Sequence, residues 1–180
     1  MNRLAFIAFI MVYSTIYSFS NDTIVNYYSN GIIKEVFLGE VNKNDTLRLG
    51  FYEFYNSEGN IIQKGAYINN ELNGFFEVFY KNGRSKIKSN YVIGKKDGLY
   101  QLFDIYGNLR QQINFKNDLL DGDFIQYDFQ GNIERKTHYC LDKKIGIELI
   151  YNKYNHVQSR IEYKADTING LYETFYDDGN

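Results

Sequence analysis

The residues with the clearest potential for metal binding or nucleophilic catalysis are His138 and Cys140, which lie two positions apart. In a β-strand this spacing places both side chains on one face. A zinc site needs three or four ligands, but the chain contains only one other histidine, His156, and no other cysteine. A single thiol without a neighbouring base is more often inert than reactive. We therefore expect the pair to be a surface feature, His156 to be a turn residue, and the chain to have no metal site.

Neighbouring carboxylates, which serve as acid–base pairs in many enzymes, occur at Asp121 and Asp123 and at Asp177 and Asp178. Both pairs fall in segments predicted to be turns, where Asp is favoured because its side chain hydrogen-bonds nearby backbone groups. The glycines follow no nucleotide-binding fingerprint. The chain is therefore predicted to have no catalytic residues and no cofactor, and not to be an enzyme.

The strongest charged pattern is a series of basic residues separated by multiples of 24 positions. The members of this series are Lys64, Lys88, Lys136 and Arg160, with Gln112 in the remaining place. On one face of a sheet they would form a basic column with steps of about 10 Å. Glu53 and Glu77 are expected directly opposite Lys64 and Lys88. Two hypotheses remain open: a solvated face with cross-strand ion pairs, and a surface that binds an anionic lipid or polymer.

A repeat of 24 residues organises the chain. The first glycine of each unit is Gly50, Gly74, Gly98, Gly122, Gly146 or Gly170. A second glycine follows nine positions later in five units, and in the other the place is taken by Asn155, since Asn tolerates positive φ best among other residues. Seventeen positions after the first glycine come Tyr67, Tyr91, Phe115, Tyr139 and Tyr163. Further aromatic residues follow the first glycine by two and by five positions, with Glu148 as an exception.

Each unit reads as a β-hairpin. Residues 51–55 and 61–67 are predicted strands around a turn at 57–60, and 69–74 is predicted to be a longer turn into the next unit. The second unit carries an Asn-Gly pair, Asn82 and Gly83, that is typical of a tight hairpin turn. Alternation places Ile61, Gly65 and Tyr67 on one face. The aromatic residue five positions after the glycine breaks this alternation, which indicates either a bulge or a second aromatic column on the other face.

The predicted fold class is therefore all-β, an elongated single-layer stack of antiparallel β-hairpins. The repeats are predicted at 50–73, 74–97, 98–121, 122–145 and 146–169, with a partial repeat at 170–180. Residues 21–49 form a degenerate first repeat with about four inserted residues. Residues 1–20 combine a positive start, an apolar run and small residues, which is typical of a secretory signal peptide cleaved after Ser20. An uncleaved anchor and a buried first strand are the alternatives. Cleavage would place the mature chain in the periplasm, at the cell surface or outside the cell.

The repeat resembles the MORN-repeat variant family from about residue 27 to residue 180. The motif is clearest at 74–83 and 170–179, where two glycines enclose regularly placed aromatic residues. The resemblance implies an elongated stack of hairpins. Bacterial members are often labelled antitoxin-like, and eukaryotic relatives are associated with membrane tethering and scaffolding. The chain departs from the pattern at Glu148, Asn155 and the inserted first unit, so the fifth full repeat is expected to be the least regular.

Composition narrows the choice of partner. The net charge of −2 supplies no basic field for nucleic acid. The single cysteine excludes an intramolecular disulfide, so packing and strand pairing must provide the stability. The leading hypothesis is an exported scaffold that binds another protein. The alternatives are a module that binds glycan or an anionic membrane surface, an antitoxin-like partner of a toxin, and self-association through an open sheet edge.

Overall fold

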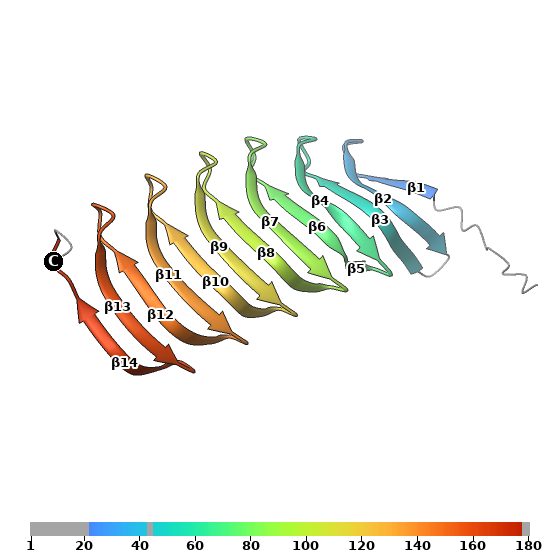
Figure 1. Cartoon of the computed structure of the whole chain (residues 1–180). Helices are drawn as coiled ribbons and strands as arrows, with labels where there is room; N and C mark the ends of the chain where they lie inside the picture. Colours follow the sequence, from blue (N-terminus) through green and yellow to red (C-terminus); the bar gives the residue numbers. More distant parts are fainter. Residues whose placement is uncertain (1–21, 43–44, 178–180) are drawn as a thin grey trace, which may run out of the picture.

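The computed structural model describes residues 22–42 and 45–177, which form one open antiparallel sheet of 14 strands (Figure 1). The strands are β1 (Asp22–Tyr27), β2 (Ile33–Asn42), β3 (Asp45–Tyr55), β4 (Ile61–Ile68), β5 (Glu71–Leu72), β6 (Gly74–Phe79), β7 (Ser85–Val92), β8 (Lys95–Phe103), β9 (Leu109–Lys116), β10 (Leu119–Tyr127), β11 (Ile133–Cys140), β12 (Lys143–Tyr151), β13 (Val157–Lys164) and β14 (Thr167–Thr174). Among these residues the structure has no helix with the length and hydropathy needed to span a bilayer. The predicted signal peptide lies outside the described residues.

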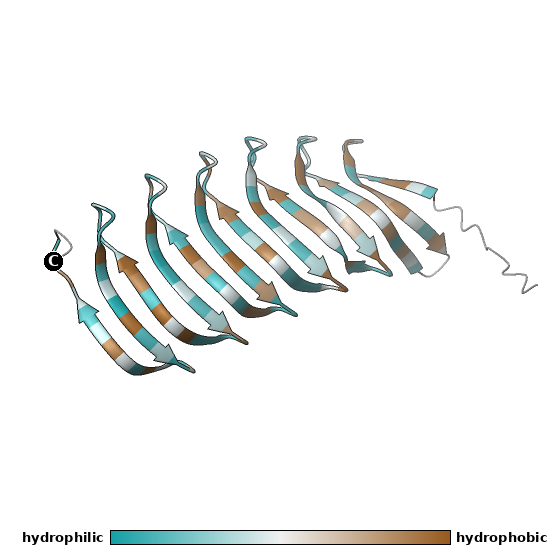
Figure 2. Cartoon of the chain, viewed as in Figure 1, coloured by the Kyte–Doolittle hydropathy of each residue, from teal (hydrophilic) through white to brown (hydrophobic). Residues whose placement is uncertain are grey.

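The strands follow one another across the sheet in chain order, with β5 pairing beside β6 on β4. Each unit therefore contributes one hairpin, and successive hairpins lie side by side from β1 to β14 (Figure 1). This arrangement confirms the predicted single-layer stack of hairpins. Hydrophobic and hydrophilic residues alternate along the strands (Figure 2), as expected for a sheet without a second layer over either face.

The two kinds of turn are the reverse of the prediction. Within the second unit, the Gly83 amide donates to the Tyr80 carbonyl at 2.9 Å, and φ is positive at Gly83 but not at Asn82. This is a type I turn followed by a left-handed residue. The tight two-residue turn lies between units, where Asn69 and Asn70 have φ values of 50° and 66°, as type I′ requires. The predicted longer turn at 69–74 is therefore wrong, because Glu71 already pairs with Ile68.

Bulges set which side chains share a face. Phe54 pairs with Gln63 and Tyr55 with Ile61, so Ile62 is an extra residue in β4. The prediction that Ile61 lies on the same face as Gly65 is wrong, because this extra residue reverses the alternation. Tyr55 lies on the same face as Ile61. Both readings of the broken alternation are therefore present, a bulge in one strand and a second aromatic column on the other face.

A second bulge lies at the first glycine of each unit. Ser89 pairs with Tyr100 and Tyr91 with Lys96, so three residues centred on Gly98 lie opposite a single residue of β7. Gly98 has a φ of 101°, a value that side-chain-bearing residues rarely adopt. The repeated glycine is therefore the residue that allows each hairpin to bulge against the one before it.

Two faces result from this register. The aromatic face carries the aromatic residues that follow the first glycine by two and by seventeen positions. Its rings meet edge to face in the pairs Tyr52–Tyr67, Phe76–Tyr91, Tyr100–Phe115 and Phe124–Tyr139, with centroid distances of 5.1, 5.7, 5.9 and 6.2 Å. The lysine face carries Lys64, Lys88, Lys136 and Arg160 together with the aromatic column of Tyr55, Phe79, Phe103, Tyr127 and Tyr151.

The most buried row runs across the aromatic face. Its best-covered members are Phe37, Tyr52, Ser89, Ile113, Thr137, Glu148 and Ile161, each with no more than 8% of its surface exposed. Neighbours in this row are direct cross-strand partners, as in Phe37 opposite Tyr52 and Thr137 opposite Phe124. The core of this single layer is therefore a line of side chains covered by the rings on either side.

The sheet absorbs the irregular units without a break. The residues inserted before Gly50 lengthen a hairpin, because Glu40 pairs with Leu47 and Val41 with Thr46 beyond the usual register. The fifth full unit pairs continuously from Ile145 opposite Lys164 to Ile150 opposite Ser159, with the usual bulge beyond. The expected irregularity of this unit is therefore absent.

The turns between units are linked to one another. Side-chain oxygens of Asn70, Asp118, Asp142 and Asp166 accept hydrogen bonds from Arg48, Lys96, Leu120 and Lys144 amides at 2.7, 2.8, 2.6 and 2.8 Å. The Asp142 amide also donates to the Leu120 carbonyl at 2.9 Å. Each of these turns is therefore fixed onto the turn of the preceding unit, which was not apparent from the sequence alone.

Replacing Asp142 tests this contact. Asp142→Gly keeps the positive φ accessible and has a natural precedent in Gly94 at the equivalent place, but it removes the acceptor. We expect it to lower the free energy of unfolding by about 1–2 kcal/mol, from the lost hydrogen bond and the greater freedom of the unfolded chain. Asp142→Asn, with the precedent of Asn70, retains the acceptor and should change the free energy of unfolding little. Urea unfolding measures both, and equal stability of the two variants would contradict the proposed linkage.

Candidate binding surface

The predicted basic column lies in one row on the lysine face. The residues of this row, in order across the sheet from the first complete repeat, are Glu53, Lys64, Glu77, Lys88, Gln101, Gln112, Ile125, Lys136, Leu149, Arg160 and Glu173. Glu53 lies opposite Lys64 and Glu77 opposite Lys88, which confirms the predicted register. The basic residues alternate with acidic, amide and apolar ones.

The cations of this row have acidic partners. Glu77, only 6% exposed, lies 3.2 Å from the Lys64 ammonium and 3.9 Å from that of Lys88. Glu53 is not the partner of Lys64, and instead accepts a hydrogen bond of 2.6 Å from the Tyr55 hydroxyl. Lys136 pairs with Asp123 at 3.1 Å and Arg160 with Glu173 at 3.8 Å. These contacts favour the hypothesis of a solvated face with ion pairs over that of an anion-binding column.

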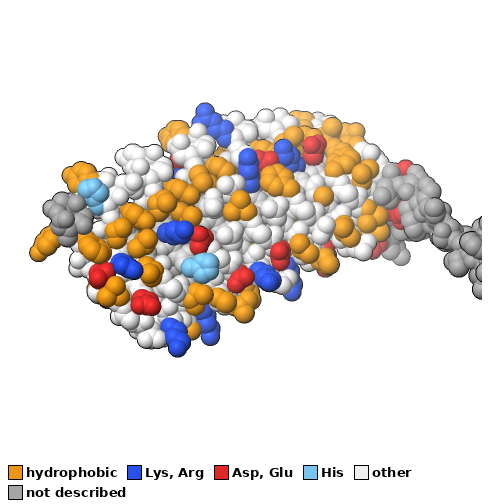
Figure 3. Space-filling view, in the orientation of Figure 1, with side chains coloured by type: hydrophobic (Ala, Val, Ile, Leu, Met, Phe, Trp, Pro, Cys, Tyr) orange, Lys and Arg blue, Asp and Glu red, His pale blue; other side chains and the backbone are white. Residues whose placement is uncertain are grey.

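The lysine face also exposes apolar side chains. Phe51, Phe75, Leu99, Ile147 and Leu171 follow the first glycine of their units and are each between 37% and 49% exposed. In the space-filling view, hydrophobic side chains are interspersed with charged ones across the visible face (Figure 3).

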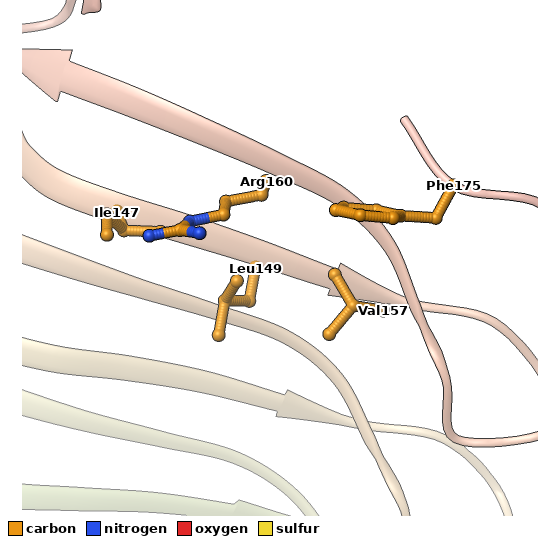
Figure 4. A pocket seen from close by; sticks show the side chains of 5 residues that line it. All are labelled: Ile147, Leu149, Val157, Arg160 and Phe175. Carbon is orange, nitrogen blue, oxygen red and sulfur yellow. The ribbon is translucent and has the colours of Figure 1, made fainter. Parts of the chain in front are cut away.

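An apolar hollow of about 450 Å³ lies on this face near the end of the described chain. It is lined by Ile147 and Leu149 from β12, Val157 and Arg160 from β13, and Phe175 beyond β14 (Figure 4). Its one charged residue, Arg160, already pairs with Glu173. The hollow therefore offers apolar surface but no free charge to select a ligand.

The residues that suggested metal or acid–base chemistry do not assemble into one site within the described part of the chain. Asp123 lies within β10 and not in a turn as predicted, and its carboxylate is 2.7 Å from His138 Nδ1. This hydrogen bond holds the pKa of Asp123 below its usual value. Asp121 accepts from the Leu141 amide at 3.3 Å, and Cys140 is exposed with a free thiol. Within residues 22–42 and 45–177 no group of three or more His, Cys, Asp or Glu side chains could hold a metal ion.

The remaining pair of candidate carboxylates lies beyond the last strand. His156 occupies a turn, as expected, and its Nδ1 lies 2.9 Å from the Asp177 carbonyl oxygen. This contact joins the turn of one unit to the chain of the next. Asp178 lies outside the described residues.

The aromatic face contains a groove of about 390 Å³ near the middle of the sheet. This aromatic groove is lined by Phe76, Val78, Ile87, Tyr91, Lys96, Tyr100, Gln111, Ile113 and Phe115. Tyr91 and Phe115 were identified from the sequence only as structural members of the repeat. Here they are walls of a groove whose lining is otherwise mostly aliphatic or aromatic.

On one side of this groove, Glu148 takes the place of a ring and forms an ion pair with Lys144. Glu148 is only 3% exposed, and its carboxylate accepts hydrogen bonds of 2.9 Å from both Lys144 and Thr137. Burial acts to raise the pKa of Glu148, but these two hydrogen bonds and the positive charges of Lys144 and Arg135 together outweigh it, and the net shift is downward. The Lys144 ammonium also lies 4.8 Å from the centre of the Tyr163 ring. Glu148 therefore replaces one ring of the usual pair, and the remaining ring, Tyr163, contacts the Lys144 ammonium instead.

A similar polar cluster lies on the other side of the groove. The Arg48 guanidinium is 3.1 Å from the Glu35 carboxylate, which also accepts a hydrogen bond of 2.8 Å from Asn26. Arg48 lies over the ring of Phe37 at 4.8 Å. Burial, with a contribution from Glu35, raises the pKa of Tyr52 to about 12. Each flank of the groove thus holds a cation that is neutralised within the chain.

Ser89, at the centre of the aromatic face, is 2% exposed, and its hydroxyl has no hydrogen-bond partner within the described part of the chain. It lies between Phe76 and Tyr100, its direct partners on the two adjacent strands. Burial raises the pKa of Tyr91, and the nearby Ser89 hydroxyl opposes part of this shift without forming a hydrogen bond of acceptable geometry. An unpaired buried hydroxyl costs stability, so a structural role alone does not account for Ser89.

No family model matches this chain, and a search of curated proteins likewise gives no match. The resemblance to MORN-repeat variants therefore stays a prediction from the repeat pattern.

The Lys144–Glu148 pair can be tested with a double-mutant cycle. Lys144→Leu alone leaves a buried carboxylate without its cation and should lower the free energy of unfolding by about 2–3 kcal/mol. The double variant Lys144→Leu with Glu148→Tyr recreates the pattern of other units, as in Leu120, and should recover most of this loss. Urea unfolding of both single variants and the double variant measures the coupling, and additive effects would contradict it.

The same pair predicts a dependence of stability on pH. Since the pKa of Glu148 is lower in the folded state than its reference value of 4.5, its contribution is present above that value. The contribution is lost as the pH falls through the folded-state pKa. Urea unfolding between pH 7 and pH 3 should therefore show a steeper loss for the natural chain than for the double variant. Parallel pH profiles would contradict this role of Glu148.

Ser89 and Thr137 occupy equivalent places in their units and provide a matched pair for a second test. Ser89→Ala removes an unpaired buried hydroxyl and should raise the free energy of unfolding by about 1 kcal/mol. Thr137→Val keeps the side-chain shape but removes the hydrogen bond to Glu148, and should lower the free energy of unfolding by a similar amount. Thermal or urea unfolding distinguishes the two signs. Destabilisation by Ser89→Ala would show that the hydroxyl supports the fold.

Proposed function

We propose that this protein is an exported, non-enzymatic repeat scaffold that binds another protein through the aromatic groove. The observation that carries the proposal is the set of partly exposed rings and aliphatic side chains that line this groove. Grooves with such a lining offer the apolar contact area on which protein recognition depends. The hairpins hold the rings in a fixed geometry, which reduces the entropy lost on binding.

The chemistry of the two faces favours a protein partner over a glycan or an anionic membrane. A sugar presents hydroxyl groups along its length, whereas the polar groups in the lining of the aromatic groove are Lys96, Gln111 and the hydroxyls of two tyrosines. Hydroxyl groups buried there without partners would cost binding energy. Lys64, Lys88, Lys136 and Arg160, which could attract anionic lipid, have acidic neighbours.

Export and membership of the MORN-repeat variant family are parts of the same proposal. The signal-like composition of residues 1–20 supports export, and the 24-residue hairpin unit supports the family assignment. Sequencing the amino terminus of the protein from its native source tests the first part. A mature chain that begins at Asn21 is expected, and a chain that retains residues 1–20 would contradict cleavage.

Matched variants on the two faces test the binding surface. Phe76→Ala with Tyr100→Ala removes two rings from the aromatic groove. Phe75→Ala with Leu99→Ala removes exposed side chains from the same strands, β6 and β8, on the lysine face. A partner captured from the native source by cross-linking and then purified should bind the first variant at least 30-fold more weakly, a loss of about 2 kcal/mol.

The control variant should bind the purified partner with nearly natural affinity. Circular dichroism and thermal unfolding establish that both variants remain folded at the assay temperature. Loss of binding only in the lysine-face variant would place the interface on the other side of the sheet, and a chain that captures no partner would contradict the scaffold function.

A further inference from the structure

A cation recurs on the aromatic face in every second unit. Arg48, Lys96 and Lys144 are separated by 48 residues, two repeats, whereas Leu72 and Leu120 occupy the units between them. Each lies beside an aromatic ring, with the Lys96 ammonium 5.3 Å from the centre of the Phe115 ring. The three cations therefore form a widely spaced series along the surface that contains the aromatic groove.

Among the described residues, the central cation of these three is the one that forms no ion pair. Arg48 pairs with Glu35 at 3.1 Å and Lys144 with Glu148 at 2.9 Å. Lys96, which lines the aromatic groove, forms no ion pair within the described residues. Its charge is thus available to a ligand, while the charges on both flanks are already neutralised.

The unpaired hydroxyl of Ser89 lies in the same part of the face. Ser89 is the cross-strand partner of Phe76 and Tyr100, and both of these rings line the aromatic groove. Lys96 is the cross-strand partner of Tyr91, two residues along β7 from Ser89. The Ser89 hydroxyl lies near Tyr91 but has no hydrogen-bond partner within the described residues. The groove therefore contains a cation without an ion-pair partner, and a buried hydroxyl lies between two of the rings that line it.

We propose that Lys96 and Ser89 form a binding site for a carboxylate, and that the partner segment bound in the aromatic groove carries an Asp or Glu flanked by apolar side chains. This inference rests on the proposed function and specifies the chemistry of the partner. The ammonium would pair with the carboxylate and the hydroxyl would donate to it, as charge-assisted hydrogen bonds require. The flanking apolar side chains would cover the rings.

The groove favours a carboxylate over a phosphate. One compact ammonium group balances one negative charge, whereas a phosphate monoester carries close to two at neutral pH. The other groove residues, apart from Gln111, offer aromatic and aliphatic surface. A single acidic residue within an apolar segment therefore fits both the charge and the lining.

Selection from a random peptide library displayed on phage tests the proposal without knowledge of the natural partner. The full folded chain is the bait, and the selected peptides are then synthesised for titration by fluorescence polarisation. We expect enrichment of sequences with an Asp or Glu between apolar residues. Replacing that acidic residue by Gln or Asn should weaken binding by about tenfold, and replacing it by Lys should weaken it further.

Variants of the bait locate the site. Lys96→Met keeps the apolar stem over Phe115 but removes the charge. It should reduce the affinity for the acidic peptide about tenfold. The affinity for the Gln or Asn counterpart of that peptide should stay nearly unchanged. Lys95→Met, the adjacent exposed residue of β8, is the matched control and should change neither affinity. Ser89→Ala should reduce the preference for the acidic peptide by a smaller factor, with the chain still folded.

The outcomes separate this inference from the proposed function. Selected peptides without acidic residues that depend on Phe76 and Tyr100 would overturn the carboxylate site but support the binding surface. An acidic preference that survives Lys96→Met would likewise overturn it. Peptides that bind independently of Phe76 and Tyr100 would contradict the aromatic groove as the binding site. A phosphopeptide that outcompetes its Glu counterpart would contradict the carboxylate as the ligand.

Discussion

The structure depends on contact between neighbouring hairpins, because a single layer has no second sheet or helix to cover it. Rings such as Phe76 and Tyr91 meet edge to face within a hairpin, and the row of small and aliphatic residues between rings joins one hairpin to the next. An isolated hairpin is marginal in water. Stability therefore accumulates along the stack, as in other repeat proteins, and requires no disulfide.

This dependence explains how the chain can vary within a regular frame. Glu148 takes the place of a ring and remains buried because Lys144 and Thr137 satisfy its carboxylate. At the other end, Arg48 and Glu35 combine an ion pair with coverage of Phe37. At one flank a polar pair thus replaces a ring, and at the other it covers a ring, while the units in the middle keep their ring pairs. The aromatic groove lies between these two ion pairs, and its own cation, Lys96, forms no ion pair within the described residues.

The periodic glycines and aromatic residues were sufficient to predict the stack of hairpins, because both signals are local and repeat in phase. The turn types were not predictable in the same way. Asn82-Gly83 suits two classes of turn, and the positive φ values at Ile93, Leu141 and Ala165 oppose ordinary residue preference. Likewise, Glu148 was identified only as an exception to the repeat, and Lys96 was not identified as a site residue. Their neighbours are defined only by the bulged register, which no spacing in the sequence reveals.

The links between successive turns give the stack a direction. In the fourth unit, for example, Asp142 accepts from the Leu120 amide and also donates to the Leu120 carbonyl, so it binds backbone of the unit synthesised before it. As the chain leaves the ribosome, each new turn therefore finds its docking groups already in place. Folding can then proceed in the order of translation, with each completed hairpin acting as the template for its successor.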